Sequence, residues 1–328
     1  MLTVKIPLRV SLFGGGTDLP SFYRRNQYGS VISFSINKYI YISLKNHEDI
    51  FNEKFRFNYS KTEICNSISK IQNDIIRESI KFFNYKGKLY INTISDVPSS
   101  SGLGSSSSFA VGLVIAFNKF LGIKISSRKI LEQAINLEVK ILNKPIGLQD
   151  HYGCYYSGLK YLKFLNNNKV ILKKIKINKK LNNILQSLQF FWTKIQRNSE
   201  TVLKEQNNRY KINKENLLRI RSINETVFKK IKKNDYNINC IGKFLDESWN
   251  LKKKLSSNIS NPFIDKAYNL AKINGALGGK ILGAGNGGFI MILSKKKYHK
   301  KISNALSNMG LHETFFKINN KPITIIKN

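Results

Sequence analysis

The chain has 328 residues, of which 41% are hydrophobic, so it is long enough for two compact domains or one large one, and its composition argues against disorder. Its net charge of +35 comes mostly from lysines spread along the whole chain. This pattern indicates a solvated basic surface rather than a nucleic-acid footprint, and it favours encounter with anionic substrates. Three cysteines without paired spacing exclude a disulfide framework and a zinc site, and no apolar run nears the roughly 20 residues that cross a bilayer. We therefore expect a cytoplasmic protein without a membrane partner.

Hydrophobic patterning predicts a mixed α+β chain. The expected strands are residues 4–13, 31–44 and 89–94, and the expected helices of the first half are 106–120 and 128–142. A lysine-rich crossing at 169–180 leads to a more helical half, with helices at 214–233, 241–255 and 262–277 and a strand–loop–strand pattern at 279–293. We place a domain boundary near residue 178, which gives domains over 1–178 and 179–328, and we expect a monomer or a homodimer.

The first strand ends on three glycines and an acid, in the run Arg9-Val-Ser-Leu-Phe-Gly-Gly-Gly-Thr-Asp18. An aspartate in this place could accept hydrogen bonds from sugar hydroxyls, and Arg9 could pair with a second carboxylate or with phosphate. A glycine turn followed by a capping aspartate explains the same residues without any ligand. Taken alone, this segment leaves both interpretations open.

The most informative segment is the Pro/Ser/Gly loop at residues 98–108, between a predicted strand and a predicted buried helix. Gly102 and Gly104 allow the backbone to turn its N–H groups toward a polyphosphate, and the following helix offers its positive N-terminal end. The serine hydroxyls add donors or a Mg²⁺ ligand. The lysine of G-x-x-x-x-G-K-S/T is missing, so this is not the P-loop. A flexible linker is the alternative, although linkers are not normally wedged between a strand and an apolar helix.

Two acids follow at Glu138 and Asp150, on a predicted helix and just after it. Phosphoryl transfer requires Mg²⁺ on the phosphates and a group that orients or deprotonates the attacking hydroxyl. Glu138 with a serine hydroxyl can hold the metal, while Asp150 can take the proton. An ordinary surface pair is the alternative.

Near the C-terminus, the run Gly283-Ala-Gly-Asn-Gly-Gly288 formally matches the dinucleotide fingerprint G-x-G-x-x-G. A strand rather than a helix is predicted after it, so we reject dinucleotide binding. The run instead predicts a tight loop that brings backbone to the active site, with a simple hairpin turn as the alternative.

Together, these four segments resemble the kinase superfamily of galactokinase, homoserine kinase, mevalonate kinase and phosphomevalonate kinase (the GHMP kinases). Its phosphate loop, P-x-x-x-G-L-G/S-S-S, is matched by residues 98–106, and its glycine-rich third motif by residues 280–288. The resemblance implies ATP and Mg²⁺ as cofactors and an active site between two domains. The N-terminal domain would be similar to the second domain of ribosomal protein S5, and the C-terminal domain would be ferredoxin-like.

The resemblance also assigns roles to residues. Asp150 would be the catalytic acid group, Arg9 would pair with it and stabilise the transferring group, and Mg²⁺ would bind Glu138 with Ser105 or Ser106. The residues expected to hold the ATP phosphates are Pro98, Ser101, Gly102, Leu103, Gly104, Ser105, Ser106 and Ser107. The residues expected to bind the sugar substrate are Gly15, Gly16, Thr17, Asp18, Arg24, Gly285 and Gly287. Thr193 and Arg197 could close over it. Arg24, with its neighbour Arg25, could bind a distal phosphate or form a basic surface turn.

The expected substrate follows from a difference between this sequence and that of galactokinase. The Glu-His pair that precedes Thr-Asp in galactokinase is Gly15-Gly16 here, and the segment around it resembles the D-glycero-D-manno-heptose 7-phosphate kinases and the kinase half of fucokinases. The run Gly147-Leu-Gln-Asp-His-Tyr152 is similar to the G-K-Q-D-Q-Y of the heptose kinases, with two replacements. This implies phosphorylation of the C1 hydroxyl of the heptose 7-phosphate to the 1,7-bisphosphate, on the route to a GDP-heptose. A fucokinase- or galactokinase-like sugar 1-kinase and a basic nucleic-acid-binding module are the alternatives.

Overall fold

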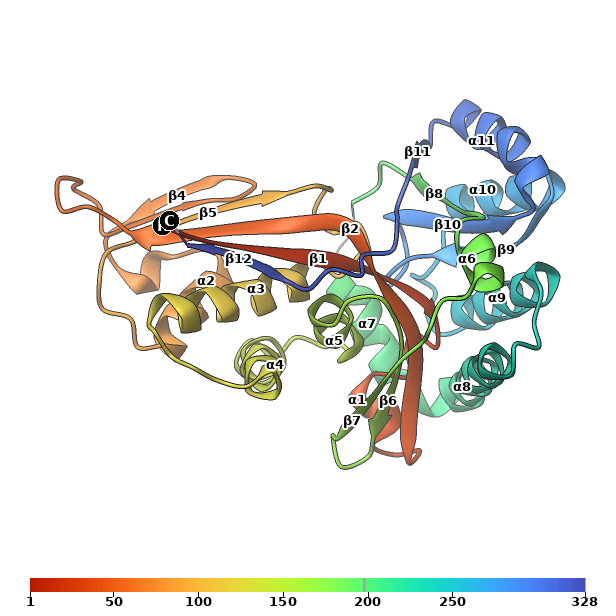
Figure 1. Cartoon of the computed structure of the whole chain (residues 1–328), viewed down its shortest axis with the longest axis horizontal. Helices are drawn as coiled ribbons and strands as arrows, with labels where there is room; N and C mark the ends of the chain where they lie inside the picture. Colours follow the sequence, from red (N-terminus) through yellow and green to blue (C-terminus); the bar gives the residue numbers. More distant parts are fainter. Residues whose placement is uncertain (197–198, 328) are drawn as a thin grey trace.

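The protein, described by a computed structural model over residues 1–196 and 199–327, contains two β-sheets that are each covered by helices (Figure 1). The first sheet contains β1 (Leu2–Phe13), β2 (Tyr28–Asn46), β3 (Phe55–Asn58), β4 (Thr62–Cys65), β5 (Leu89–Ser95), β6 (Leu159–Leu165), β7 (Val170–Lys174) and β12 (Thr324–Lys327). The second contains β8 (Leu188–Trp192), β9 (Ala276–Ile281), β10 (Phe289–Ser294) and β11 (His312–Thr314). The predicted α+β class is confirmed.

The helices lie between these strands along the chain, singly or in runs. They are α1 (Pro20–Tyr23), α2 (Asp74–Phe82), α3 (Ser105–Phe120), α4 (Ser127–Ile135), α5 (Gln149–Tyr155), α6 (Lys179–Leu185), α7 (Ser199–Asn208), α8 (Tyr210–Lys233), α9 (Ile238–Lys253), α10 (Pro262–Ile273) and α11 (His299–Asn308). Short 3₁₀ turns occupy Ile68–Lys70 and Lys296–Tyr298, and a π-helix occupies Asn136–Ile141. Within the described ranges, no helix combines the length and the apolarity needed to cross a membrane.

Strand β2 is the spine of the first sheet. Its first half pairs with β6 and its second half with β5, while β1 runs antiparallel along most of its length. The register of β1 shifts between Pro7 and Arg9 and again between Ser11 and Phe13. Bulges of this kind re-aim side chains and are common next to active sites. Here they flank Arg9 and Ser11, two residues that reach the functional cleft.

Helix α3 anchors the loop that precedes it. Every residue from Ser107 to Asn118 is buried, because the helix packs on β1 and β2 and is itself covered by α4 and α5. A Cβ on Gly112 would lie 2.7 Å from Ile42 Cδ1, so glycine lets the helix approach the sheet closely. Each fully buried large apolar side chain contributes about 1.5–3 kcal/mol. The N-terminus of α3 is thereby held in a fixed place.

Two predicted helices end differently in the structure. The predicted helix 128–142 is α4 followed by the π-helix, whose extra residue per turn changes the face of the helix just where Glu138 lies. The predicted helix 262–277 ends at Ile273, because Gly275 adopts a φ of +102° and β9 begins at Ala276. The first difference matters for function, because Glu138 becomes fully buried.

The second sheet has the strand order β11-β8-β10-β9 and is antiparallel throughout, with α9 and α10 packed on β9. The boundary proposed near residue 178 falls between β7 and α6. The last strand, β12, nevertheless returns to the first sheet and pairs with β1, so both ends of the chain lie at the same end of that sheet (Figure 1).

Candidate active site

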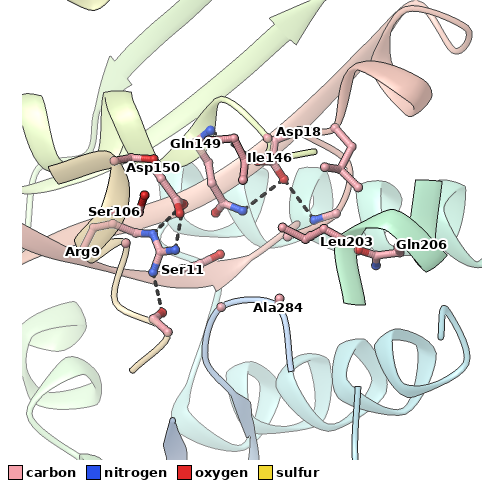
Figure 2. Close-up of a pocket in the computed structure, with 18 of the residues that line it drawn as sticks. Arg9, Ser11, Asp18, Ser106, Ile146, Gln149, Asp150, Leu203, Gln206 and Ala284 are labelled. Atoms are coloured by element: carbon pink, nitrogen blue, oxygen red, sulfur yellow. Dashed lines mark hydrogen bonds and ion pairs between the residues drawn. The ribbon is translucent and has the colours of Figure 1, made fainter. Parts of the chain in front are cut away.

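A cleft opens between the two sheets and gathers most of the predicted site residues (Figure 2). The predicted residues that line it are Arg9, Gly15, Gly16, Asp18, Gly102, Gly104, Ser105, Ser106, Ser107 and Asp150. They come from the strand β1, the turn after it, the loop before α3 and the start of α5. The opposite wall is supplied by α7, α9 and the loop between β9 and β10. The site is therefore built between the two halves of the chain.

The phosphate loop has the geometry of an anion-binding turn. Gly102 and Gly104 have φ values of +86° and +76°, in the left-handed region that favours glycine. Gly104 is the N-cap of α3 and no side chain caps the first turn of that helix, whose serines 105–107 line the cleft. The backbone N–H groups and the helix dipole there are suited to a phosphate. Pro98 is exposed, and Ser101 and Leu103 are buried, outside the lining of the cleft.

Arg9 and Asp150 form a pair at the floor of the cleft. Arg9 Nε donates a hydrogen bond of 2.8 Å to Asp150 Oδ1, and Arg9 Nη2 lies 2.7 Å from the same oxygen. Arg9 Nη1 donates to the Gly102 carbonyl at 2.8 Å, and the Arg9 backbone N–H donates to Leu103 O at 3.0 Å. Arg9 is 3% exposed, whereas one quarter of the Asp150 side chain is open to the cleft. The arginine thus ties the phosphate loop to a carboxylate that a ligand can reach.

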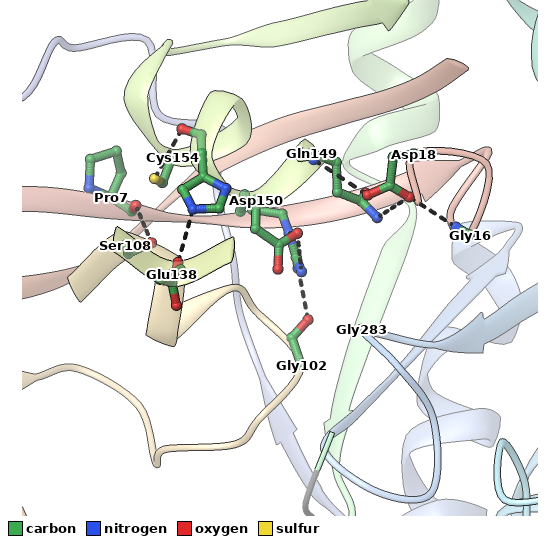
Figure 3. Close-up of polar contacts among 12 residues, drawn as sticks. Pro7, Gly16, Asp18, Gly102, Ser108, Glu138, Gln149, Asp150, Cys154 and Gly283 are labelled. Atoms are coloured by element: carbon green, nitrogen blue, oxygen red, sulfur yellow. Dashed lines mark hydrogen bonds and ion pairs between the residues drawn. The ribbon is translucent and has the colours of Figure 1, made fainter. Parts of the chain in front are cut away.

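Glu138 lies directly behind the phosphate loop (Figure 3). Its Oε1 accepts a 2.7 Å hydrogen bond from Ser106 Oγ, its Oε2 lies 2.9 Å from His151 Nε2, and Lys144 Nζ is 4.0 Å from Oε1. Burial alone would raise the pKa of Glu138, but the His151 contact, the Lys144 charge and the Ser106 hydroxyl together lower it below its ordinary value. A carboxylate kept ionised beside a serine hydroxyl fits Mg²⁺, which binds proteins through one or two such oxygens together with substrate phosphates.

Asp18 is held in a cage of donors. Its Oδ1 accepts from the backbone N–H of Gly16 and from Gln149 Nε2, both at 3.0 Å, and its Oδ2 accepts from the Gln149 backbone N–H at 3.3 Å (Figure 3). A Cβ on Gly147 would lie 1.9 Å from Asp18 Oδ2, so only glycine allows this approach. Burial and the neighbouring charge of Asp150 raise the pKa of Asp18 to about 6, against the effect of the backbone donors.

Several predicted substrate residues lie away from the lining of the cleft. Thr17 is buried, and its hydroxyl contacts the carbonyls of Gly14 and Ser30. Arg24 is exposed, and its Nε donates to Asn168 Oδ1 at 2.9 Å. The glycines of the C-terminal loop serve close packing, because a Cβ on Gly285 would lie 2.6 Å from Ile259 and one on Gly287 would lie 2.7 Å from Ile195. Their neighbours Gly283 and Ala284 line the cleft in their place.

The C-terminal glycine loop also docks on the phosphate loop. The Phe289 N–H donates to Ser101 O at 3.2 Å, and a Cβ on Gly288 would lie 2.3 Å from that oxygen. Thr193, which we expected to close over a substrate, is buried and bonds the Gly288 carbonyl through both its N–H and its hydroxyl. Arg197 lies outside the described residues. Contact between the two glycine-rich loops thus aligns the two walls of the cleft.

Sequence reasoning missed several residues in or beside the cleft. Gln149 is next to Asp150 in a run that we singled out, so its position carried a usable signal. Lys280 begins the third motif, yet nothing in the sequence indicated that its ammonium group lies close to Gly15. Leu203 and Gln206 come from α7, which carries no motif, and they reach the cleft only through tertiary packing (Figure 2).

Two sequence families match the chain. The GHMP kinases N terminal domain matches residues 53–158, and the GHMP kinases C terminal domain matches residues 228–311. The first match contains the phosphate loop, Glu138 and Asp150, and the second contains the C-terminal glycine loop. The two matches thus include the loops that face each other across the cleft.

Two relatives and a solved structure are similar over most or all of the chain. The D-glycero-alpha-D-manno-heptose 7-phosphate kinase of Campylobacter jejuni is 30% identical over 91% of this chain and 91% of its own length. A galactokinase of Pyrococcus furiosus is 26% identical over 93% of this chain and 92% of its own. The crystal structure of a D-glycero-D-manno-heptose 1-phosphate kinase from Bacteroides thetaiotaomicron superposes with a TM-score of 0.78 at 24% identity, covering 100% of this chain and 99% of that one.

Proposed function

This chain belongs to the GHMP kinase family and is an ATP-dependent sugar kinase, and we propose that its acceptor is the C1 hydroxyl of D-glycero-D-manno-heptose 7-phosphate. The product would be the 1,7-bisphosphate, an intermediate toward a GDP-activated heptose. The observation that carries the proposal is the reachable carboxylate of Asp150, held by Arg9 against the phosphate loop. The similarity to the heptose 7-phosphate kinase of C. jejuni supports the choice of acceptor.

The chemistry would proceed by in-line transfer. The backbone of the phosphate loop and the N-terminus of α3 would bind the ATP phosphates. Asp150 would accept the proton of the attacking hydroxyl while the new O–P bond forms and the bond from the γ-phosphorus to the bridging oxygen breaks, releasing ADP. Arg9 would hold Asp150 in place and offset negative charge on the transferring group. Ser106 and Glu138 would hold Mg²⁺, which neutralises charge on the phosphates when bound.

Asp18 would select the acceptor. Its carboxylate is fixed by Gln149 and by the Gly16 N–H, and it faces the cleft near Asp150. A carboxylate with fixed orientation can accept hydrogen bonds from neighbouring sugar hydroxyls and so place one of them against the catalytic base. The glycine at position 15 leaves room beside it for a larger acceptor than a side chain there would allow.

An assay of ADP release coupled to NADH oxidation tests this function. The protein with Mg²⁺-ATP is offered D-glycero-D-manno-heptose 7-phosphate, sedoheptulose 7-phosphate, fucose, galactose and mevalonate in turn, with Asp150→Asn as the control for contaminating kinases. We expect turnover on the heptose phosphate that the variant lacks. Turnover confined to galactose or fucose would show that the acceptor is that of another sugar 1-kinase. Equal rates in the variant and the wild type would show that Asp150 is not the catalytic base.

A further inference from the structure

We propose that Lys280 recognises a negatively charged group on the acceptor, and that Gly15 has no side chain so that this group can reach the lysine. The inference rests on the proposed function, because it concerns the sugar phosphate that the kinase would bind. It assigns a role to a residue of β9 in the second sheet, whose ammonium group lies 4.0 Å from the position of a Cβ on Gly15.

The side chains around Gly15 converge on one point. At the position where a Cβ on Gly15 would lie, the nearest atoms are Ser11 Oγ at 3.4 Å, Gln149 Nε2 at 3.8 Å and Lys280 Nζ at 4.0 Å. Lys280 comes from β9, whereas Ser11 comes from β1 and Gln149 from α5. Three separate elements therefore bring polar groups to the space above Gly15.

Of these groups, Lys280 Nζ and Ser11 Oγ lack partners within the described chain, whereas Gln149 Nε2 donates to Asp18 Oδ1. Lys280 is only 4% exposed, yet no residue in the ranges 1–196 and 199–327 forms a hydrogen bond or an ion pair with its ammonium group. The buried Ser11 Oγ, Gln149 Oε1 and Gln206 Nε2 also have no partner among those residues. Buried polar atoms in native proteins are nearly always hydrogen-bonded, so a cluster of unpaired ones around a cleft indicates a polar ligand.

The charge of the cluster favours an anion. Burial and the nearby charge of Arg9 lower the pKa of Lys280 to about 8, and Asp18 offsets this only in part. Among the described residues of the cleft, Arg9 is paired with Asp150, and Lys252 donates to the Gly283 carbonyl. Lys280 therefore remains available to bind a ligand, and an anionic group would offset the free-energy cost of burying its charge.

The position indicates the acceptor rather than ATP. Arg9 contacts the phosphate loop. Lys280 instead lies near Ser11, which follows Arg9 by two residues along β1. Two residues of strand place Ser11 about 6–7 Å from Arg9, in the direction of Asp18. Asp18 and Gln149 form the proposed acceptor wall. The other candidate for a distal phosphate, Arg24, is exposed and lies outside the lining of the cleft.

The backbone does not explain why residue 15 is a glycine. Gly14 and Gly16 have φ values of +82° and +96°, which favour glycine, and a Cβ on Gly14 would lie 2.0 Å from Ser30 O. Gly15 has no such φ, and a Cβ there would meet only ordinary contacts. The missing side chain is therefore explained by the space that it leaves for a ligand beside Lys280.

The test compares heptose 7-phosphate with the same heptose lacking the phosphate. Lys280→Met removes the charge and should raise KM for the phosphorylated acceptor on the order of 10- to 100-fold, the range for loss of a charge-assisted hydrogen bond, without raising KM for ATP. Gly15→Asp places a carboxylate beside the lysine and should have the same effect. In Lys280→Arg, which keeps the charge, the ratio of the two acceptor KM values should stay close to that of the wild type. Gly15→Ala, which fills part of the space without adding a charge, should raise the KM for the phosphorylated acceptor less than Gly15→Asp does.

An equal effect of Lys280→Met on both acceptors, or a rise in KM for ATP, would refute the inference. If the wild type uses neither form of the heptose, the proposed acceptor is wrong, and Lys280 is then tested with inorganic phosphate. With the nucleotide site filled by Mg²⁺ and the non-hydrolysable analogue AMPPNP, phosphate should raise the Tm of the wild type but not of Lys280→Met or Gly15→Asp. An equal shift in the variants, or none in the wild type, would overturn the role of Lys280.

Discussion

The pair of Arg9 and Asp150 has a catalytic role and a structural role, and the two can be measured separately. Asp150→Asn keeps the shape of the side chain but removes its capacity to take a proton, so we expect kcat to fall about 10²- to 10⁴-fold. The affinity for Mg²⁺-AMPPNP should change less than about threefold, because the carboxylate contacts Arg9 and not the phosphate loop. Single-turnover kinetics and calorimetric titration measure the two quantities separately.

The same substitution should also reduce stability. It leaves the nearly buried Arg9 guanidinium without its ion pair, a loss of about 3–5 kcal/mol for a fully buried pair. Since one quarter of the Asp150 side chain is exposed, water can replace part of that interaction, and we expect about 1–3 kcal/mol by urea unfolding. Combining Arg9→Met with Asp150→Asn should cost less than the sum of the single changes. Strict additivity, or an Asp150→Asn enzyme within tenfold of the wild-type kcat, would refute this account.

Four further substitutions test the surroundings of the pair. Ser106→Ala and Glu138→Gln should each raise the Mg²⁺ concentration for half-maximal rate about tenfold, and an unchanged metal dependence would rule out this metal site. Gly147→Ala should displace the Asp18 carboxylate and raise the acceptor KM at least about tenfold while KM for ATP stays constant; a rise in KM for ATP instead would contradict the separation of the two sites. Burial lowers the pKa of Lys160 to about 7, so the folded protein binds this proton less tightly than the unfolded chain does. The resulting loss of unfolding free energy is complete below pH 7, decreases as the pH rises, and vanishes near pH 10.5. Unfolding free energies of the wild type should therefore rise over that window relative to Lys160→Met, by up to about 1.4 kcal/mol per pH unit, and parallel curves would show that Lys160 is not buried as a charged group.

The sequence predicted the elements whose local pattern and tertiary role agree. The phosphate loop was recognisable because a strand, a Gly/Ser turn and an apolar helix follow each other, and the structure has β5, the loop and α3 in those places. The amphipathic pattern after residue 128 continued into the π-helix, because hydrophobic periodicity does not distinguish one extra residue per turn from a regular helix. The burial of Glu138 therefore could not be predicted.

The predicted site residues that the fold brings together belong to short motifs. Such motifs contain the four charged residues Arg9, Asp18, Glu138 and Asp150. The fold brings them to one cleft or directly behind it. The structure shows a packing role for the glycines of the C-terminal loop, and a glycine required for close packing looks the same in sequence as one that makes room for a substrate. Lys280 was missed for a related reason, since the polar groups nearest to it come from β1 and α5 and approach it only when the two sheets dock.

The product of the reaction tests the central claim most directly. After incubation of the protein with Mg²⁺-ATP and D-glycero-D-manno-heptose 7-phosphate, proton-coupled ³¹P spectra of the purified sugar report which carbon carries each phosphate. The account predicts two phosphomonoesters, one coupled to the two protons of C7 and a new one coupled to the single anomeric proton. A new phosphate on any other carbon, a diphosphate formed on the existing ester, or an unchanged sugar would contradict it.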